Sequence, residues 1–333
     1  MILVVTHERC GQHEISVGHP ERPARLSAAL AGLDAAGLDE AVELVASQPA
    51  SLPDILRVHD ASMVERLAAL DELGGGFIDG DTSMNRHSFD AARLAAGAGL
   101  VAIEHLRAGT HNAALCVVRP PGHHATPSTS MGFCLLNSIS VTAAALVAAG
   151  ERVAIVDFDA HHGNGTQDAF YDSDEVLFVS LHQYPWYPGT GRFDEVGHGR
   201  GTGYTVNIPF AAGTSGDAYR HAFDAVLWPK IESFRPTWIL VSAGFDGHRL
   251  DPLAQLGLTS GDYGDLAAKL VEMVPPGRLI AYLEGGYHLD SLAASVAATI
   301  GAFAGVSVTG EAASSGPRAD DVIAAVRAQH GLR

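Results

Sequence analysis

The sequence predicts an α/β fold in which helices cover both faces of a central, mainly parallel sheet. Two observations lead to this prediction. Short apolar runs rich in β-branched residues recur along the 333 residues, and helical patterns separate most of them. Parallel neighbours need crossover connections, and the alternation of strand and helix supplies them. The hydrophobic content of 47% is enough to bury one large core.

The apolar runs are short enough for strands, and their lack of polar alternation predicts burial on both faces. They lie at 2–6, 114–118, 152–156, 176–181, 204–208, 238–242 and 278–283. Helical patterns lie at 88–107, 138–149, 217–233, 262–273 and 289–304. We therefore expect one catalytic domain over residues 1–305. Small and polar residues at 305–320 predict a loop, so 306–333 should form a loop and a short C-terminal helix that packs on or trails the domain.

Charge and composition exclude several function classes. The formal net charge is −17 and no Lys/Arg cluster stands out, so a nucleic-acid partner is not expected. No stretch reaches membrane-spanning length, and the opening "MILVVTHERC" is too short and too poor in basic residues for a signal peptide. Three scattered cysteines, Cys10, Cys116 and Cys134, predict structural thiols in a reducing, cytoplasmic location. Oligomeric state is left open.

The stretch "VAIVDFDAHHGNGT" places charge directly after an apolar strand. Alternate side chains of an extended chain share a face, so Asp157, Asp159 and His161 should project to one side. Ligands gather beyond the carboxyl ends of parallel strands, where this cluster falls. Buried carboxylates need a compensating cation, and Asp with His suits a divalent metal such as zinc. The alternative is a surface loop with incidental charge.

Three other strand ends carry candidate groups. Asp246 in "WILVSAGFDGH" follows a strand and could supply a third ligand, although one aspartate alone is weak evidence. The adjacent His123 and His124 in "RPPGHHATPSTSMGFC" suit a proton-transfer pair, or they could be ordinary surface histidines. Tyr287 in "YLEGGYHLD" could polarise a carbonyl oxygen, or it could be a half-buried core residue.

Together these segments resemble the zinc-dependent histone deacetylase and acetylpolyamine amidohydrolase family, in particular its class II-like bacterial deacetylases. The resemblance extends over nearly the whole chain and is carried by "HPERPARL", "RPPGHHA", "MGFCLLN", "DFDAHHGNGT", "SLHQYPWYPGTG", "SAGFDGHRLDPL" and "LEGGYHLDSLAASV". It implies the arginase/deacetylase fold, with a central sheet of eight strands. It also implies a hydrolase that removes acetyl or another short acyl group from an amine.

The resemblance implies a role for each matched residue. Asp159, His161 and Asp246 match the zinc ligands, and Tyr287 matches the tyrosine that stabilises the oxyanion. The second residue of the pair His123 and His124 matches the general base and acid, and the first matches its electrostatic partner.

Further roles follow from the same resemblance. Asp157 matches the carboxylate that orients His123, and Asn164 stands where class II members have asparagine and class I members have aspartate. Two structural potassium sites are implied, one at Asp157, Asp159, His161, Ser180 and Leu181, and the other at Phe170, Ser173, Val176 and Tyr204. The substrate channel is expected to be walled by Gly132, Phe133, Trp186, Tyr187 and Leu253, although Trp186 could instead be ordinary loop packing.

Several substrate classes and functions remain to be weighed. Polyamine-selective relatives often carry a glutamate where this chain has Leu253, so acyl-lysine is favoured over an acylpolyamine. A dinuclear manganese ureohydrolase shares the fold, but Gly163, Gly244 and His248 stand where further carboxylates would be needed. A catalytically silent acyl-ligand binding protein would be expected to lack a ligand or the tyrosine, and all of them are present.

Overall fold

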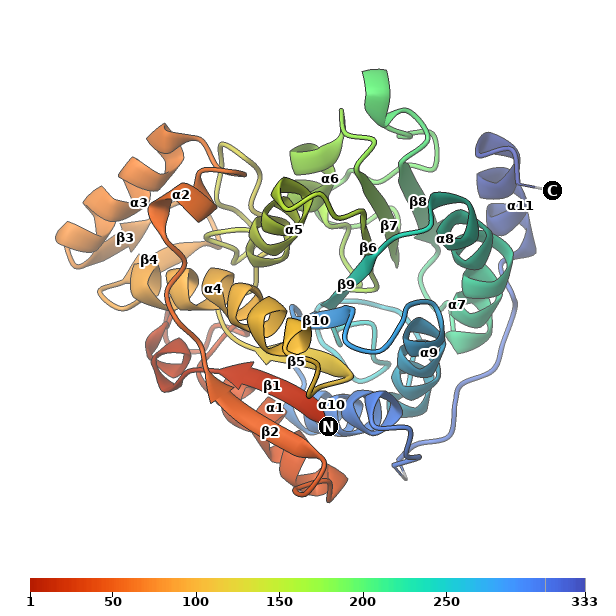
Figure 1. Ribbon diagram of the computed structural model, residues 1–333, viewed down its shortest axis with the longest axis horizontal. Coiled ribbons are helices and arrows are strands. Elements are labelled where there is room, and N and C mark those ends of the chain that lie inside the picture. The colour runs from red at the N-terminus through yellow and green to blue at the C-terminus, as the bar shows by residue number, and fades with distance from the viewer. Residues whose placement is uncertain (309, 333) are drawn as a thin grey trace.

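The computed structural model describes residues 1–308 and 310–332, and Figure 1 shows the arrangement of its elements. Within these residues eight strands form one sheet in the order β2-β1-β5-β10-β9-β6-β7-β8, and all neighbours are parallel. The predicted parallel α/β architecture is therefore confirmed. The strands are β1 Ile2–Thr6, β2 Val42–Ala46, β5 Ala113–Val117, β6 Val153–Asp157, β7 Val176–Gln183, β8 Thr205–Phe210, β9 Trp238–Ala243 and β10 Leu279–Leu283. A separate two-stranded hairpin joins β3 Gly75–Phe77 to β4 Ser83–Asn85.

The central strands are buried on both faces, which explains their continuous apolar sequences. Strand β2 differs because it lies at the edge of the sheet and pairs only with β1. Its residues are half-buried or exposed, with Glu43 and Leu44 facing solvent. An edge strand of this kind has no continuous apolar run, and the sequence pattern therefore missed it.

Helices cover the sheet in two layers (Figure 1). Helices α4 and α5 pack on one another over β1, β5, β6 and β9, whereas α1, α10 and α9 form the opposite layer. The helices are α1 Ala24–Ala36, α2 Leu52–Ile55, α3 Ala61–Glu72, α4 Ser88–Arg107, α5 Ser138–Ala148, α6 Asn164–Phe170, α7 Gly216–Ala222, α8 Trp228–Phe234, α9 Ser260–Glu272, α10 Leu289–Phe303 and α11 Asp320–Gln329. None of these described helices combines the length and apolar character needed to cross a bilayer.

The helix predicted over 217–233 is not continuous. A π-helical segment, η3 Phe223–Leu227, separates α7 from α8, and the N–H of Trp228 bonds to the carbonyl of Phe223. Pro229 follows at the start of α8 and has no N–H to donate into the preceding turn. The proline therefore accounts for a break that apolar periodicity does not reveal.

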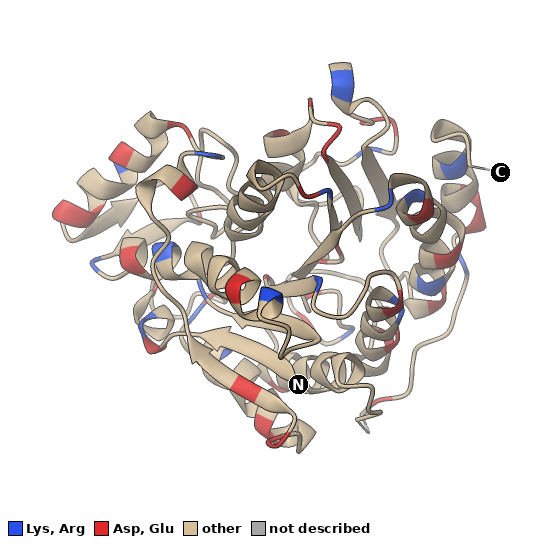
Figure 2. Cartoon of the chain, viewed as in Figure 1, with Lys and Arg blue, Asp and Glu red and all other residues tan. Residues whose placement is uncertain are grey.

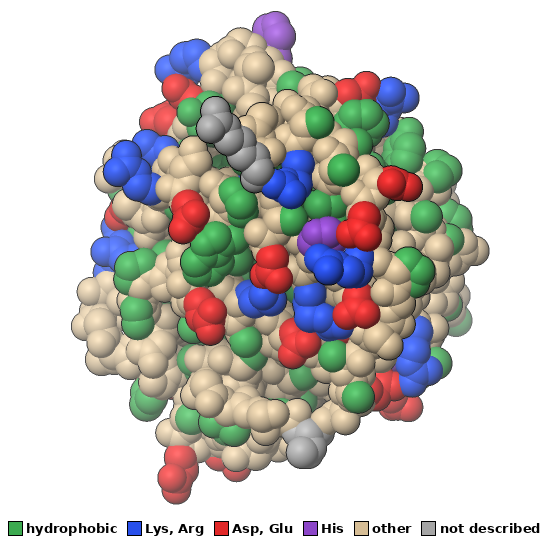
Figure 3. Space-filling model, turned by 90° about the vertical axis from the view of Figure 1, so that its right-hand side faces the viewer, with side chains coloured by type: hydrophobic (Ala, Val, Ile, Leu, Met, Phe, Trp, Pro, Cys, Tyr) green, Lys and Arg blue, Asp and Glu red, His purple; other side chains and the backbone are tan. Residues whose placement is uncertain are grey.

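Helix α11 follows the long segment after α10 and packs near β8. Ile323 and Val326 are buried in the same core cluster as the sheet. The segment between the two helices is anchored at Ser314, whose N–H bonds to Asp262 Oδ1 at 3.0 Å and whose hydroxyl bonds to Asp262 Oδ2 at 2.6 Å. Acidic and basic side chains are interspersed on the side of the molecule that carries α11 (Figure 1 and Figure 3).

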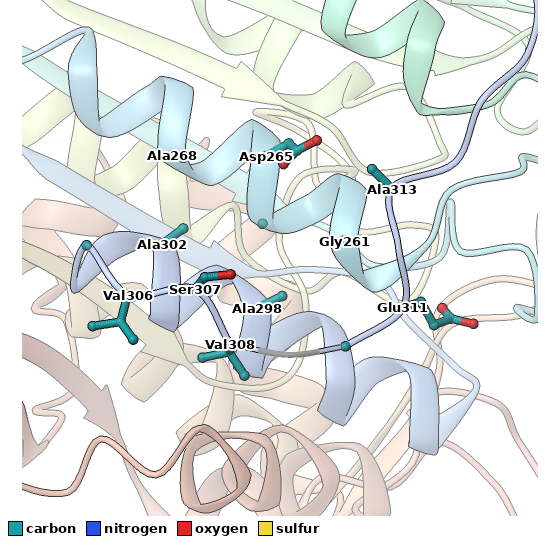
Figure 4. Close-up of a pocket in the computed structure, with 13 residues that line it drawn as sticks. Gly261, Asp265, Ala268, Ala298, Ala302, Val306, Ser307, Val308, Glu311 and Ala313 are labelled. Carbon is teal, nitrogen blue, oxygen red and sulfur yellow. The ribbon is translucent and has the colours of Figure 1, made fainter.

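Figure 2 shows lysines and arginines dispersed among the elements, mostly one at a time. A cavity of about 540 Å³ lies between α9, the C-terminal half of α10 and residues 305–308 and 310–313 (Figure 4). Glycine and alanine dominate its lining, with Asp265 and Glu311 at its polar parts. The predicted site residues lie at the carboxyl ends of the strands, and β10 leads from there into the N-terminal end of α10. The cavity lies at the C-terminal half of α10, so it is separate from the predicted site.

A buried ion cluster ties α1 to the sheet. Glu21, Arg25 and Arg119 have no exposed side-chain surface, and both arginines bond to the Glu21 carboxylate, at 3.1 Å from Arg25 and 2.5 Å from Arg119. Burial alone would raise the pKa of Glu21, but Arg119 and His13 outweigh it and hold this pKa well below its ordinary value. Glu21 is thus the negative centre of the cluster.

Glu21→Ala is expected to lower the free energy of unfolding by about 3–5 kcal/mol, because two guanidinium groups would stay buried without a counter-charge. The depressed pKa means that this stabilisation is present at neutral pH and is lost as pH falls below the ordinary glutamate range. Denaturant unfolding across pH measures both effects. Asp194→Ala, which removes an exposed partner of Arg192, is the control and should change stability little. An equal loss in both variants would contradict the prediction.

Candidate active site

The predicted site residues follow four strands that are adjacent in the sheet. Strands β5, β10, β9 and β6 are neighbours in that order, and all four are parallel. Their carboxyl ends therefore meet at one edge. The histidine pair follows β5, Tyr287 follows β10, Asp246 follows β9 and the aspartate–histidine stretch follows β6.

Asp159, His161 and Asp246 converge at this edge. Each offers one ligand atom, and these atoms all lie within 4.8 Å of one another. His161 Nδ1 lies 3.2 Å from Asp159 Oδ1 and 2.9 Å from Asp246 Oδ2. Burial by itself lowers the pKa of His161, but Asp246 and Asp159 outweigh it and raise this pKa to about 10. The two carboxylates thus create a strongly cation-attracting position at this nitrogen.

Glycines make room for the two carboxylates. A Cβ at Gly244 would lie 1.9 Å from Asp159 Oδ2, and one at Gly285 would lie 2.4 Å from Asp246 Oδ2. The N–H of Gly285 donates to Asp159 Oδ2 at 2.8 Å, and that of Ala160 donates to Asp246 Oδ1 at 2.8 Å. Two held carboxylates and one imidazole nitrogen form a donor set that fits a divalent ion such as zinc.

Hydrogen bonds to Asp157 and Asn164 orient the two histidine rings. His123 Nδ1 donates to Asp157 Oδ2 at 3.0 Å, and His124 Nδ1 donates to Asn164 Oδ1 at 2.7 Å. The two rings lie 4.0 Å apart between centroids. Because each Nδ1 faces an acceptor, Nε2 of His124 is left free for proton transfer.

Opposite electrostatics act on the two rings. Burial lowers the pKa of His123, but Asp159 and Asp157 outweigh it and raise it to about 10. Burial also lowers the pKa of His124, and the neighbouring His123 and His161 lower it further, well below its ordinary value. These opposite shifts favour a charged His123 and a neutral His124, so His124 is the available base and His123 is its electrostatic partner.

Tyr287 stands beside these groups with its phenol protonated. Burial raises its pKa well above the ordinary value, against the opposing effect of the nearby Arg25. The Arg25 guanidinium lies 4.7 Å from the centre of the Tyr287 ring. Arg25 also donates to the carbonyls of Gly286, at 2.6 Å, and Glu284, at 2.5 Å, so it holds the segment that carries the tyrosine.

One cavity of about 260 Å³ reaches His124, His161 and Tyr287. Its walls include every residue expected in the channel, and its full lining is Asp81, His124, Gly132, Phe133, His161, Trp186, Tyr187, Leu253 and Tyr287. Trp186 therefore lines the cavity, and its indole N–H donates to the carbonyl of Leu253 at 3.0 Å. Phe133 has a left-handed backbone with φ of 68°, and its ring stands edge-on to Tyr287 at 5.9 Å.

The residues expected at the potassium sites fall into two groups at β7. Asp157 and Ser180 are register partners on β6 and β7, and Leu181 follows Ser180. At the other end of β7, Ser173 donates its N–H to the Phe170 carbonyl at 3.0 Å. The remaining members of the second group are Val176, the first residue of β7, and Tyr204, whose carbonyl accepts the N–H of Phe178 at 2.8 Å.

Three site residues were missed by the sequence reasoning. Asp81 lines the cavity from the β3–β4 turn. Glu284 is buried and accepts the N–H groups of Gly122 and His123 at 2.6 and 3.2 Å. Asp251 accepts the N–H of Tyr287 at 2.6 Å. Glu284 stands inside "LEGGYHLD" and Asp251 inside "RLDPL", so their position in already selected motifs was the available signal.

Comparison with known proteins gives the family. Residues 19–303 match the model of the histone deacetylase domain. The chain belongs to the histone deacetylase family. It is 43% identical over 293 residues to a probable deacetylase of Archaeoglobus fulgidus, covering 86% of this chain and 81% of the relative. It is 39% identical over 282 residues to a histone deacetylase-like amidohydrolase of Pseudomonas aeruginosa, covering 83% and 74%.

The crystal structure of the HDA15 HD domain superposes on this histone deacetylase family member with a TM-score of 0.91. The two share 36% sequence identity, and the match covers 99% of this chain and 94% of that one. The predicted arginase/deacetylase fold is thereby confirmed. The resemblance stated from sequence motifs is confirmed as well, and it places the chain among deacetylases and amidohydrolases.

Proposed function

We propose that the protein is a zinc-dependent amidohydrolase that removes acetyl, or another short acyl group, from an acyl-lysine side chain and releases a carboxylate and a free amine. One observation carries the proposal. His124, Tyr287 and His161 line a single cavity, and His161 belongs to the ligand set that Asp159 and Asp246 complete. Relatives named deacetylase and amidohydrolase support the reaction class.

The protein's own groups divide the work of amide hydrolysis. Zinc held by the ligand set would supply a Lewis acid that polarises the amide carbonyl and acidifies a water molecule. His124 accepts the proton of the attacking water at Nε2 and returns it to the departing amine. His123, charged and held by Asp157, stabilises negative charge nearby. The Tyr287 hydroxyl donates to the oxyanion that develops from the carbonyl oxygen.

The cavity walls favour a substrate with an extended methylene chain. Phe133, Trp186 and Tyr187 supply flat aromatic surface, which suits the apolar stem of an acyl-lysine. Leu253 adds an apolar wall where a cationic polyamine would gain from a carboxylate. An acylpolyamine is therefore the second candidate substrate.

A dinuclear manganese ureohydrolase is disfavoured by the glycines beside the ligands. A Cβ at Gly163 would lie 2.2 Å from Asp157 Oδ2, and one at Gly244 would lie 1.9 Å from Asp159 Oδ2. A bridging carboxylate cannot stand at either position without displacing an aspartate that is already in use. A silent acyl-ligand binding protein is disfavoured because the base and the phenol are both in place beside the ligand set.

We also propose that the protein binds structural potassium and that it is located in the cytoplasm. One or two structural K⁺ ions would bind oxygen atoms of the two groups described above, one beside Ser180 within β7 and one beside Tyr204, whose carbonyl accepts the N–H of Phe178. The cysteines Cys10, Cys116 and Cys134 are free and buried, which supports a cytoplasmic, reducing location.

The proposal predicts metal-dependent acyl-lysine hydrolysis. Protein stripped with a chelator should lose acetate release, and added zinc should restore it, because polarisation of the amide then returns. In a panel of acyl-lysine peptides and acylpolyamines, kcat/KM should be higher for the peptides than for acetylputrescine. Free amine and carboxylate are both quantified, together with zinc and manganese per chain.

Each remaining reading has its own outcome in this experiment. A higher kcat/KM for acetylputrescine would replace the acyl-lysine assignment with the acylpolyamine one. Two manganese ions per chain with urea released from a guanidino substrate would establish the ureohydrolase. A folded, zinc-loaded protein that binds acylated amines and hydrolyses none would establish the silent binding protein.

A further inference from the structure

One buried carboxylate joins the wall of the cavity to the segment that carries Tyr287. Asp251 Oδ1 accepts the N–H of Leu253 at 3.0 Å. Its Oδ2 accepts the N–H of Tyr287 at 2.6 Å and that of His288 at 3.2 Å. Asp251 is only 6% exposed and is absent from the cavity lining, whereas Leu253 and Tyr287 both line the cavity. A single side chain behind the wall thus holds two groups that face the substrate.

The connection continues across the wall. The Leu253 carbonyl accepts the indole N–H of Trp186 at 3.0 Å. Trp186, Leu253 and Tyr287 come from three segments that are far apart in the sequence, and two hydrogen-bonded links through Asp251 and Leu253 join them. A shift of Asp251 would therefore move the wall and the catalytic phenol relative to one another.

The segment before Tyr287 needs such an anchor. Tyr287 follows Gly285 and Gly286, and Gly286 adopts φ of 117°, a conformation that favours glycine. Glycine restricts the backbone least, so these residues alone do not fix the direction of the tyrosine. Asp251 supplies an anchor at this point, because its side chain accepts the N–H groups of Tyr287 and His288 on one side and that of Leu253 on the other.

We propose that Asp251 is a positioning residue that fixes Leu253 relative to Tyr287 and thereby sets which length of methylene stem the cavity accepts. The inference rests on the proposed amidohydrolase function and adds a determinant of its specificity. Asp251 belongs neither to the ligand set nor to the lining of the cavity, so it acts through the two backbone segments that it joins.

Asp251→Asn tests this inference at nearly constant size. An amide has one acceptor oxygen, so one of the two backbone segments would face an NH₂ donor in place of an acceptor. Misplacement by about 1 Å costs up to about 100-fold in rate, and we expect kcat per zinc-loaded, folded enzyme to fall within that range. The ratio of kcat/KM for acetyl-ornithine to that for acetyl-lysine peptides should change by about tenfold, since these stems differ by one methylene and one methylene in a pocket is worth at least that much.

Asp262→Asn is the matched control. Asp262 is also buried and accepts backbone N–H groups, from Thr259 at 2.9 Å and Ser314 at 3.0 Å, but it lies outside the cavity lining. Its replacement should lower the melting temperature and leave the ornithine-to-lysine ratio unchanged. The ratio does not depend on the fraction of folded enzyme, so it separates positioning from loss of stability.

Two further measurements decide the inference. Amide hydrogen exchange should speed up together at Leu253 and at Tyr287 in Asp251→Asn, and at neither in Asp262→Asn. In a Tyr287→Phe background, Asp251→Asn should cost much less of the remaining kcat, because it acts partly through that hydroxyl. An unchanged ornithine-to-lysine ratio with wild-type protection at both amides would overturn the inference. A wild-type enzyme inactive on every acylamine would instead overturn the proposed function, and hydrogen exchange would still decide whether Asp251 joins the two segments.

Discussion

Tyr287→Phe is expected to lower kcat for acyl-lysine hydrolysis by about 100- to 1,000-fold, the usual cost of removing one donor to a developing oxyanion. The ring would keep its place under Arg25, whose guanidinium lies 4.7 Å from the ring centre. The hydroxyl belongs to none of the three candidate metal ligands, so bound zinc should be unchanged. Steady-state kinetics and metal analysis of the same preparation measure both quantities.

Phe133→Leu is a suitable control for this prediction. Phe133 stands edge-on to Tyr287 at 5.9 Å and lines the same cavity, but it carries no donor. Its loss should mainly raise KM, because it removes wall surface that binds the substrate stem in the ground state and the transition state alike. Wild-type kcat in Tyr287→Phe would remove the phenol from the proposed mechanism.

The fold was predictable where burial is complete and less so at the margins. Strands β5, β6, β9 and β10 are buried on both faces and read as unbroken apolar runs. Strand β2 was not predicted from the sequence. It has one neighbouring strand and is partly exposed to solvent, so its residues need not form an unbroken apolar run. The π-helical break before α8 depends on a single proline and leaves the apolar periodicity intact.

Some residues of the candidate site could be predicted from the sequence, and others could not. Asp159, His161 and Asp246 could be selected because a charged residue after a buried strand is costly without a cation. Asn164 and the potassium groups were reached through the family resemblance alone. Glu284 and Asp251 act by accepting backbone N–H groups, and the partners of such bonds depend on which loops meet in three dimensions. Neither spacing nor residue type reveals these partners.

Gly244→Ala is expected to abolish tight zinc binding and, with it, hydrolysis. The added Cβ would lie 1.9 Å from Asp159 Oδ2 and 2.4 Å from its Cγ, so the carboxylate must move. Asp159 has little freedom to do so, because its oxygens accept the N–H groups of His161 at 2.9 Å and Gly285 at 2.8 Å. Displacing one of the three ligands leaves His161 and Asp246 alone, which is too few for a catalytic zinc site.

Thermal unfolding with and without zinc measures this loss independently of activity. At about 1,000 times its Kd, a ligand that binds only the folded state stabilises it by about 4 kcal/mol, so the wild-type melting temperature should rise with zinc. The melting temperature of Gly244→Ala should not rise with zinc. Gly264→Ala is the control, because its Cβ would meet Ala298 at an ordinary 3.5 Å, and it should respond to zinc as the wild type does. A zinc response in Gly244→Ala equal to that of the wild type would mean that Asp159 can retreat and still bind, and that this glycine is not required by the metal site.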